Sequence, residues 1–180
     1  ADIEVVEHIR AAGCSVVKWG APLAYGIYGI KRQLRALNLL SNKHIPPPYL
    51  RASFVQRLEL LRGLMDTDGT CLPSGACEFY TTRLALAEGV AELLRTLGIK
   101  VRISEGRASL YGKDCGPKYR IKFTTALQVF HLARKAVRQR TPQVHGTAGK
   151  RYIVDVREIE SVPVRCIAVD SPSRLFLAGH

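Results

Sequence analysis

The sequence predicts an α+β fold, in which helices pack on strands, and three observations lead to that class. A unit made of a helix, a glycine and a strand occurs twice, with Gly13 and Gly98 at equivalent positions 85 residues apart. A long helical stretch with apolar residues at helical spacing, 52–68, lies between the two copies. Segments in which apolar and polar residues alternate follow each copy, as strands require.

The helix of the first copy, within 5–16, aligns with 90–101, and each helix ends at a glycine. Strand-like residues follow, and then an apolar helix, 32–40 in the first copy and 126–137 in the second. We therefore expect two cognate αββα-type units, about 1–45 and 50–145, although a twelve-position match also arises by chance. The matching pairs are Val5 and Val90, Glu7 and Glu92, Ile9 and Leu94, Arg10 and Arg95, and Val16 and Val101. Since a long helix precedes only the second unit, we expect its counterpart upstream of Ala1.

The charge balance indicates a polyanionic partner, because 27 Lys and Arg stand against 15 Asp and Glu, a net charge of +12. Nucleic acid is the first candidate and an anionic membrane surface the second. No apolar run approaches the roughly 18–20 residues of a membrane-spanning helix, and the first residues do not resemble a secretory signal. We therefore expect a cytoplasmic protein without a membrane partner. The five cysteines form no CxxC pair, which argues against structural zinc or a disulfide framework.

The central helix ends in two carboxylates, Asp66 and Asp68, and Gly69 is expected to terminate it. Gly63, inside the helix, would let another helix approach closely. Carboxylates at a helix C-terminus face the negative end of the helix dipole, which is unfavourable unless a cation lies nearby. An EF-hand is excluded because the Glu at the twelfth loop position is missing. A buried helix with solvated aspartates is the alternative.

The segment LRGLMDTDG, Leu61–Gly69, resembles the LAGLIDADG motif of homing endonucleases. The stretches NKHIPPPYL, 42–50, and LAEGVAELLRTLGI, 86–99, are similar to the blocks that flank the second motif in intein-borne endonucleases. The resemblance is strongest over 40–105. It implies a LAGLIDADG homing endonuclease fold over 1–145, an αββαββα-type repeat that lacks its first motif helix.

The resemblance also implies metal-assisted hydrolysis of DNA phosphodiesters. Asp68 would bind Mg²⁺ together with a carboxylate outside this chain, and Asp66 would serve packing and capping. Lys43 would polarise the phosphate or assist the attacking water, and Lys122 is nominated as a second active-site lysine. For Lys43, a surface position beside the proline-rich turn is the alternative.

The predicted partner is a double-stranded DNA target, held by basic side chains of two groups. The first group alternates with apolar residues along two strands and would line one face of a sheet. The second belongs to the stretch 131–154, which contains no Asp or Glu, although such a run is often only a solvated surface. The predicted contacts are Arg102, Arg107, Lys118, Arg120 and Lys122 in the first group, and Arg134, Lys135 and Arg138 in the second.

The C-terminal part, 146–180, is expected to form β-strands, and VPVRCIAVDSPSRLFLAG, 162–179, resembles the penultimate block of inteins. This resemblance implies part of a C-terminal splicing domain. Cys166 would be the nucleophile that attacks the upstream peptide bond and forms a branched thioester, which makes the cleavage autocatalytic. The alternative is that Cys166 is a structural residue whose side chain faces a hydrophobic core. Asp170 would be a supporting polar residue or a turn residue.

The function expected from the sequence is that of an intein-derived, site-specific DNA endonuclease with part of a self-splicing domain. We expect the intact intein to be a monomer whose partners include the rest of the intein and the host flanks, and the isolated 180 residues to be inactive. One alternative is a catalytically inactive, DNA-binding intein remnant. The other is a fragment assigned to its host, a replicative DNA helicase, although no nucleotide-binding loop is present.

Overall fold

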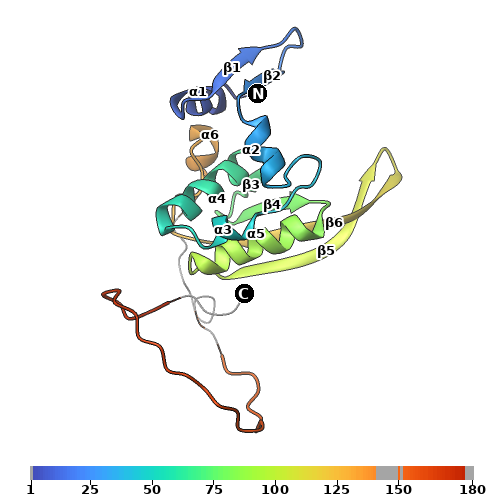
Figure 1. Cartoon of the computed structure of the whole chain (residues 1–180). Coiled ribbons are helices and arrows are strands. Elements are labelled where there is room, and N and C mark those ends of the chain that lie inside the picture. Colours follow the sequence, from blue (N-terminus) through green and yellow to red (C-terminus); the bar gives the residue numbers. More distant parts are fainter. Residues whose placement is uncertain (1, 141–149, 151, 177–180) are drawn as a thin grey trace. The chain divides into compact units, whose positions relative to one another are not determined.

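The structure is a computed structural model that describes residues 2–140, 150 and 152–176 (Figure 1). The chain divides into two compact units, Ala1–Pro142 and Gln143–His180. The helices of the first unit are α1 (Ile3–Ala11), α2 (Lys31–Ala36), α3 (Pro47–Leu50), α4 (Phe54–Asp68), α5 (Leu84–Thr96) and α6 (Ala133–Ala136). Its strands are β1 (Ser15–Lys18), β2 (Tyr25–Tyr28), β3 (Gly69–Cys71), β4 (Cys77–Thr81), β5 (Val101–Leu110) and β6 (Lys113–Phe123). The mixed architecture confirms the predicted α+β class.

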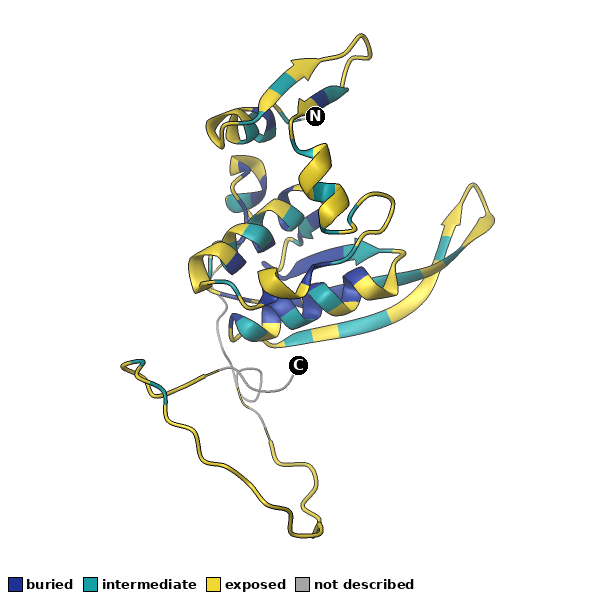
Figure 2. Cartoon of the chain, viewed as in Figure 1, coloured by how far each residue is buried: buried dark blue, intermediate teal, exposed yellow. Residues whose placement is uncertain are grey.

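A four-stranded antiparallel sheet in the order β3-β4-β6-β5 forms the centre of the first unit. Helices α4 and α5 pack on one face of this sheet, and their apolar stripes are buried there (Figure 2). Leu61 and Met65 of α4 and Val90 and Leu94 of α5 have no exposed surface. Burying such side chains stabilises the fold by about 1.5–3 kcal/mol each.

Helix α4 has a well-defined start and an abrupt end. Ser53 and Gln56 form a capping box, in which each side chain bonds the backbone N–H of the other residue. Gly69 follows the helix with an extended backbone, φ −92° and ψ 162°. A Cβ atom on Gly69 would lie 2.7 Å from the Met65 Cα and carbonyl oxygen, so close approach explains why glycine is needed here. The predicted termination at Gly69 is confirmed, and the chain enters β3 without a loop.

The two aligned glycines end their helices in the same way. Gly13 (φ 84°) and Gly98 (φ 77°) both have the left-handed conformation that glycine favours. Each N–H donates to the carbonyl of the aligned arginine, Arg10 or Arg95, at 2.9 Å. An antiparallel hairpin follows each helix, but β1 and β2 have four residues each and form a separate two-stranded sheet. The paired strands β5 and β6 are longer and belong to the central sheet.

The predicted apolar helix 126–137 is wrong in extent, because only α6, a single turn, is helical. The segment before α6 obtains its hydrogen bonds from side chains instead of a helix. Gln139 accepts from the Val129 N–H and donates to the Leu127 carbonyl, and Asp66 accepts from the N–H groups that lead into α6.

The second unit forms no strand over the residues described, 150 and 152–176, whereas the alternating pattern predicted strands there. Its apolar side chains are exposed, including Ile153 at 86% and Val164 at 83%. A strand requires a neighbour to bond its backbone and an apolar layer to cover one face, and these residues find neither within their unit. A turn at Ser171–Arg174, closed by a bond of 2.9 Å from the Arg174 N–H to the Ser171 carbonyl, is the local structure that forms.

Candidate functional site

Asp68 is the last residue of α4, and its side chain is exposed. The next residue, Gly69, begins the edge strand β3 and pairs with Phe79 of β4. Asp68 therefore lies where the helix meets the sheet. No hydrogen bond or ion pair links Asp68 to Lys43 or Lys122 in the described part of the chain.

The other motif carboxylate, Asp66, is buried and 7% exposed. Both of its oxygens accept the His131 N–H at 3.1 Å, and one also accepts the Leu132 N–H at 3.1 Å. Asp66 therefore caps the segment that enters α6, and both of its carboxylate oxygens are used in backbone hydrogen bonds. This arrangement matches the packing and capping role expected for Asp66.

The donor chemistry at the end of α4 is compatible with one Mg²⁺ ligand. Carboxylate oxygens are the ligands that Mg²⁺ prefers, and the Asp68 carboxylate is exposed and has no hydrogen bond among the described residues. No cluster of three His, Cys, Asp or Glu side chains suited to a metal occurs in residues 2–140, 150 and 152–176. Asp68 can thus contribute to a shared site but does not make a complete one.

The face of the central sheet opposite α5 carries the basic side chains. The register aligns Thr70, Glu78, Lys122 and Arg102 across the four strands. The next such row holds Tyr80, Arg120 and Ser104, and a third pairs Lys118 with Gly106. Because alternate residues of a strand share a face, Arg102, Lys118, Arg120 and Lys122 lie on one side. With strands about 4.8 Å apart, Lys122 is about 10 Å from β3, the strand that follows Asp68.

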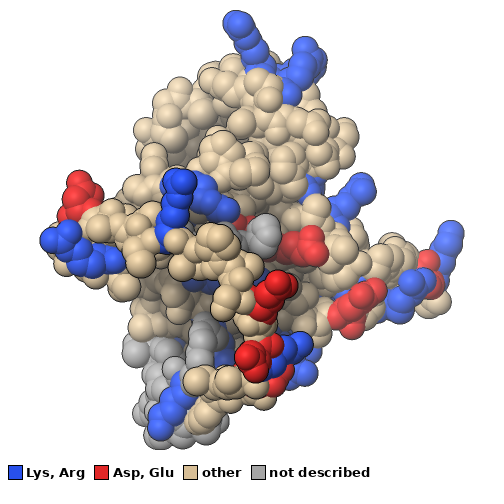
Figure 3. Space-filling view, turned by 60° about the horizontal axis from the view of Figure 1, so that its bottom comes forward, with Lys and Arg blue, Asp and Glu red and all other residues tan. Residues whose placement is uncertain are grey.

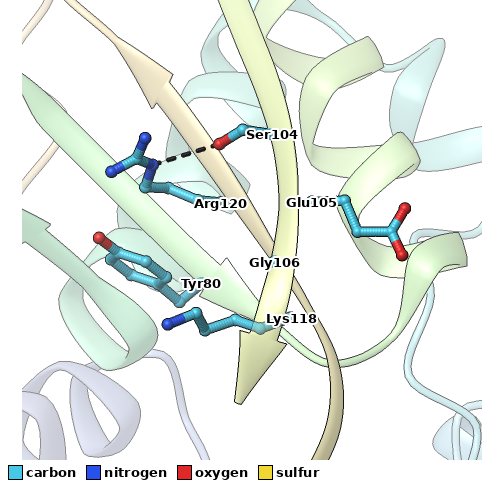
Figure 4. A pocket seen from close by; sticks show the side chains of 6 residues that line it. All are labelled: Tyr80, Ser104, Glu105, Gly106, Lys118 and Arg120. Atoms are coloured by element: carbon cyan, nitrogen blue, oxygen red, sulfur yellow. Dashed lines mark hydrogen bonds between the residues drawn. The ribbon is translucent and has the colours of Figure 1, made fainter.

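A shallow pocket lies on this face and is lined by Tyr80, Ser104, Glu105, Gly106, Lys118 and Arg120 (Figure 4). The Lys118 ammonium is 5.8 Å from the centre of the Tyr80 ring, within the range of a cation–π contact. Arg120 donates from Nε to the Ser104 hydroxyl at 3.3 Å. Figure 4 shows the Glu105 carboxylate on the far side of its strand, away from the other side chains. The open face of the pocket is therefore cationic and aromatic.

Glu78 and Tyr80 are members of this face that the sequence reasoning missed. Glu78 is 4% exposed, accepts a bond of 2.5 Å from the Tyr80 hydroxyl and lies 3.7 Å from the Lys122 ammonium. The hydrogen bond to the Glu78 carboxylate, with burial, raises the pKa of Tyr80 above its usual value. The signal was present in CEFYT, 77–81, where alternation puts Glu78 and Tyr80 on the same face.

Arg107 does not belong to this face, which corrects the prediction. It pairs with Pro117, in register with the opposite set of side chains, and the strand is irregular between Arg107 and Ser109. Its guanidinium forms an ion pair with Asp114, and the hydrogen bond from Arg107 lowers the pKa of that carboxyl. Within β5, Arg107 is five positions from Arg102, so alternation along the strand already places the two side chains on opposite faces.

The stretch 131–154 lacks acids of its own, but acidic side chains from elsewhere in the chain contact its first residues, 131–134. Arg134 donates to both carboxylate oxygens of Asp2, at 2.9 and 2.7 Å. His131 Nε2 lies 2.8 Å from Glu59, and Glu4 accepts the Ala133 N–H. On the face in Figure 3, Lys and Arg side chains stand apart, with Asp and Glu side chains among them. Among the described residues of this stretch, His131 and Arg134 therefore each lie beside an acidic side chain.

Lys135 is buried, at 8% exposure, so its prediction as a DNA contact is wrong. Its ammonium donates to the carbonyls of Met65, Asp66 and Gly69 at 2.9, 2.7 and 2.7 Å. Burial lowers the pKa of Lys135, and the neighbouring charge of Arg134 adds to that effect. Lys135 thus supplies the cation that the end of α4 required.

The other predicted residues are exposed and make no contact that specifies a role. Lys43 lies in the loop before α3, and Arg138 follows α6. Cys166 and Asp170 are exposed in the second unit, where Asp170 immediately precedes the turn. Gly63 faces open space, with nothing within 4 Å of the position where a Cβ atom would stand.

Two comparisons with known proteins found similarities to this chain. Residues 55–131 match the model of the LAGLIDADG-like domain. The whole chain is 41% identical over 182 residues to the replicative DNA helicase DnaB of Mycobacterium intracellulare, and it spans 30% of the length of that protein. The matched range includes nearly all of α4, the four strands of the central sheet and His131, whose N–H donates to Asp66. The predicted resemblance is therefore confirmed: the chain carries a LAGLIDADG-like domain over 55–131, in a setting that fits an intein inserted in a helicase.

Proposed function

We propose that this chain is part of an intein-borne, site-specific endonuclease that cuts double-stranded DNA by metal-dependent hydrolysis. The observation that carries the proposal is the position of Asp68, an exposed carboxylate at the end of the motif helix, beside a sheet face with basic side chains. The LAGLIDADG-like domain covers both features.

The sheet face would bind the DNA, because Arg and Lys side chains neutralise phosphates and reach base edges in the major groove. Arg102, Lys118 and Arg120 would make these contacts. Glu78 is buried, accepts from the Tyr80 hydroxyl and lies beside the Lys122 ammonium, so it would orient these two side chains on the face.

The catalytic part of the proposal concerns Asp68, Lys43 and Lys122. Asp68 would be one ligand of Mg²⁺, which when bound lowers the pKa of a coordinated water and stabilises negative charge on the phosphate. Lys43 and Lys122 would bind phosphate oxygens and orient the scissile group. The Lys122 ammonium lies 3.7 Å from the Glu78 carboxylate, which favours its charged form.

The splicing part of the proposal rests on the resemblance of 162–179 to an intein block. Cys166 would be the nucleophile, and its exposed position leaves the thiol accessible. Within the described residues no helix has the length and apolar character needed to cross a bilayer. A cytoplasmic location, a monomeric intein, and contacts with host flanks stay predictions.

A DNA-binding remnant without cleavage activity is the second candidate, since the described residues provide only one exposed carboxylate at the end of α4. The test uses the longest natural polypeptide that contains this chain and a plasmid with the joined host coding sequence. We expect linearisation that requires Mg²⁺, and an Asp68→Ala variant that still binds the plasmid but does not cut it. Glu88→Ala, which removes an exposed carboxylate from α5, is the matched control and should cut normally. Binding by the wild type without any nicking would select the remnant.

A further inference from the structure

The end of α4 and the segment before and within α6 hold each other by two buried contacts that run in opposite directions. Asp66 of α4 accepts the backbone N–H groups of His131 and Leu132. Lys135 of α6 donates to carbonyls at the end of α4 and the start of β3. Both side chains are more than nine-tenths buried. We call this pair of contacts the α4–α6 clamp.

Every N–H group of the Lys135 ammonium has a carbonyl partner. An ammonium has three donors, and three distances of 2.9, 2.7 and 2.7 Å account for all of them. The last turn of a helix leaves its carbonyls without intrahelical partners. Because α4 runs directly into β3, no left-handed glycine turn is available to bond them. Lys135 bonds the Asp66 carbonyl in this last turn and shares the Met65 carbonyl with the Gly69 N–H, and it has no proton free to exchange with a substrate.

The clamp brackets Asp68 on both sides along the chain. The carbonyls of Met65 and Asp66 precede Asp68, and the carbonyl of Gly69 follows it. One ammonium therefore binds the backbone on either side of the exposed carboxylate, and the conformation of the intervening residues is restricted. The positive charge also opposes the negative end of the helix dipole, where the Asp68 charge would otherwise be unfavourable.

We infer that Lys135 is a positioning residue for Asp68. Lys135 fixes the backbone that presents the Asp68 carboxylate to a divalent cation. The inference rests on the proposed role of Asp68 as a metal ligand. For the removal of the Lys135 charge, the inference predicts a change in cation affinity opposite in sign to the change that electrostatics alone predicts. Removing a nearby positive charge would by itself strengthen the binding of a cation, whereas the loss of positioning weakens it.

The test measures Mn²⁺ binding to the full chain by nuclear magnetic resonance, from the paramagnetic broadening of the backbone amides of 67–70. Lys135→Met should weaken the apparent Mn²⁺ affinity at these amides by about fivefold, comparable to the loss of one hydrogen bond. Arg138→Met removes an exposed positive charge from the same segment and is the matched control, with affinity unchanged or raised. DNA affinity, measured in parallel without metal, should change less than about twofold in Lys135→Met, because this side chain is buried and bonds backbone carbonyls.

The possible results separate the two hypotheses. If Lys135→Met is folded by circular dichroism and its Mn²⁺ affinity is unchanged or raised, the positioning role is refuted. If Lys135→Met does not fold, Lys135→Gln, which keeps a polar group for the carbonyls, is subject to the same criterion. If Asp68→Ala leaves the broadening of the wild type intact, the metal role of Asp68 fails instead. Broadening that Asp68→Ala abolishes and Lys135→Met weakens supports the inference.

Discussion

Replacing Arg120 with Gln removes one basic side chain from the open face of the sheet, and the fold offers a matched control. Arg107 is also exposed and also lies in the β5–β6 hairpin, but it belongs to the other set of side chains and pairs with Asp114. Arg107→Gln therefore makes the same chemical change on the opposite side. The comparison asks whether the predicted face is the one that binds DNA.

The magnitude follows from the number of cations on the face. If Arg102, Lys118, Arg120 and Lys122 each contact a phosphate, the slope of log K against log salt is about −3.6. Raising the salt concentration fourfold then weakens DNA binding by roughly 150-fold. With three contacts the slope is about −2.7, and the same change in salt weakens binding by roughly 40-fold.

Fluorescence anisotropy with a labelled duplex, from about 50 to 200 mM salt, measures both slopes. We expect Arg120→Gln to reduce the slope by about one and Arg107→Gln to leave it at the wild-type value. Equal reductions in the two variants would refute the assignment of faces. An unchanged slope in Arg120→Gln would show that the phosphates are bound elsewhere.

Three further predictions concern stability and pH. Asp66→Ala leaves buried backbone N–H groups without an acceptor, so we expect a loss of about 3 kcal/mol in the free energy of unfolding, measured with urea. Gly69→Ala puts a Cβ within 2.7 Å of backbone atoms and should cost about 1–3 kcal/mol, whereas Gly63→Ala, in open space within a helix, should be neutral or stabilising. Burial raises the pKa of Glu59, but hydrogen bonds from His131 and a neighbouring arginine outweigh it, so the pKa falls below its usual 4.5. Because the folded-state pKa is depressed, the stabilisation is complete above about pH 4.5 and is lost as the pH falls through the folded-state pKa. The Glu59 side chain is 48% exposed, so the contribution is at most about 1 kcal/mol, and Glu59→Gln should converge with the wild type in acid. A constant difference between the two proteins from pH 3 to 7 would contradict this account.

The central helix and the face of the sheet could be predicted from the sequence because both depend on local periodicity. The spacing of Leu61 and Met65 indicated a helical stripe, and both residues are fully buried. Alternation along 118–123 placed Lys118, Arg120 and Lys122 together, and the strand register confirms that they share a face. The same rule would have excluded Arg107 and included Glu78, so these two errors arose from applying the pattern incompletely.

The roles of the basic residues after 130 could not be predicted, because their partners are distant in the chain. Arg134 and Asp2 are 132 residues apart, and Lys135 bonds carbonyls that are 66 to 70 residues earlier. A stretch without acids therefore appeared to be a surface for phosphates. In the folded protein, Lys135 bonds carbonyls at the end of α4, and Arg134 pairs with the Asp2 carboxylate.

The sequence by itself indicated the LAGLIDADG-like domain, the motif helix and the two glycine-ended helices, since each of these depends on residues close together in the chain. Only the tertiary structure decided which charges remain exposed. Asp66 and Asp68 are two residues apart, yet one is buried under backbone N–H groups and the other is open to solvent. That difference exists because the segment 131–135 returns to the end of α4, and no local pattern specifies such a return.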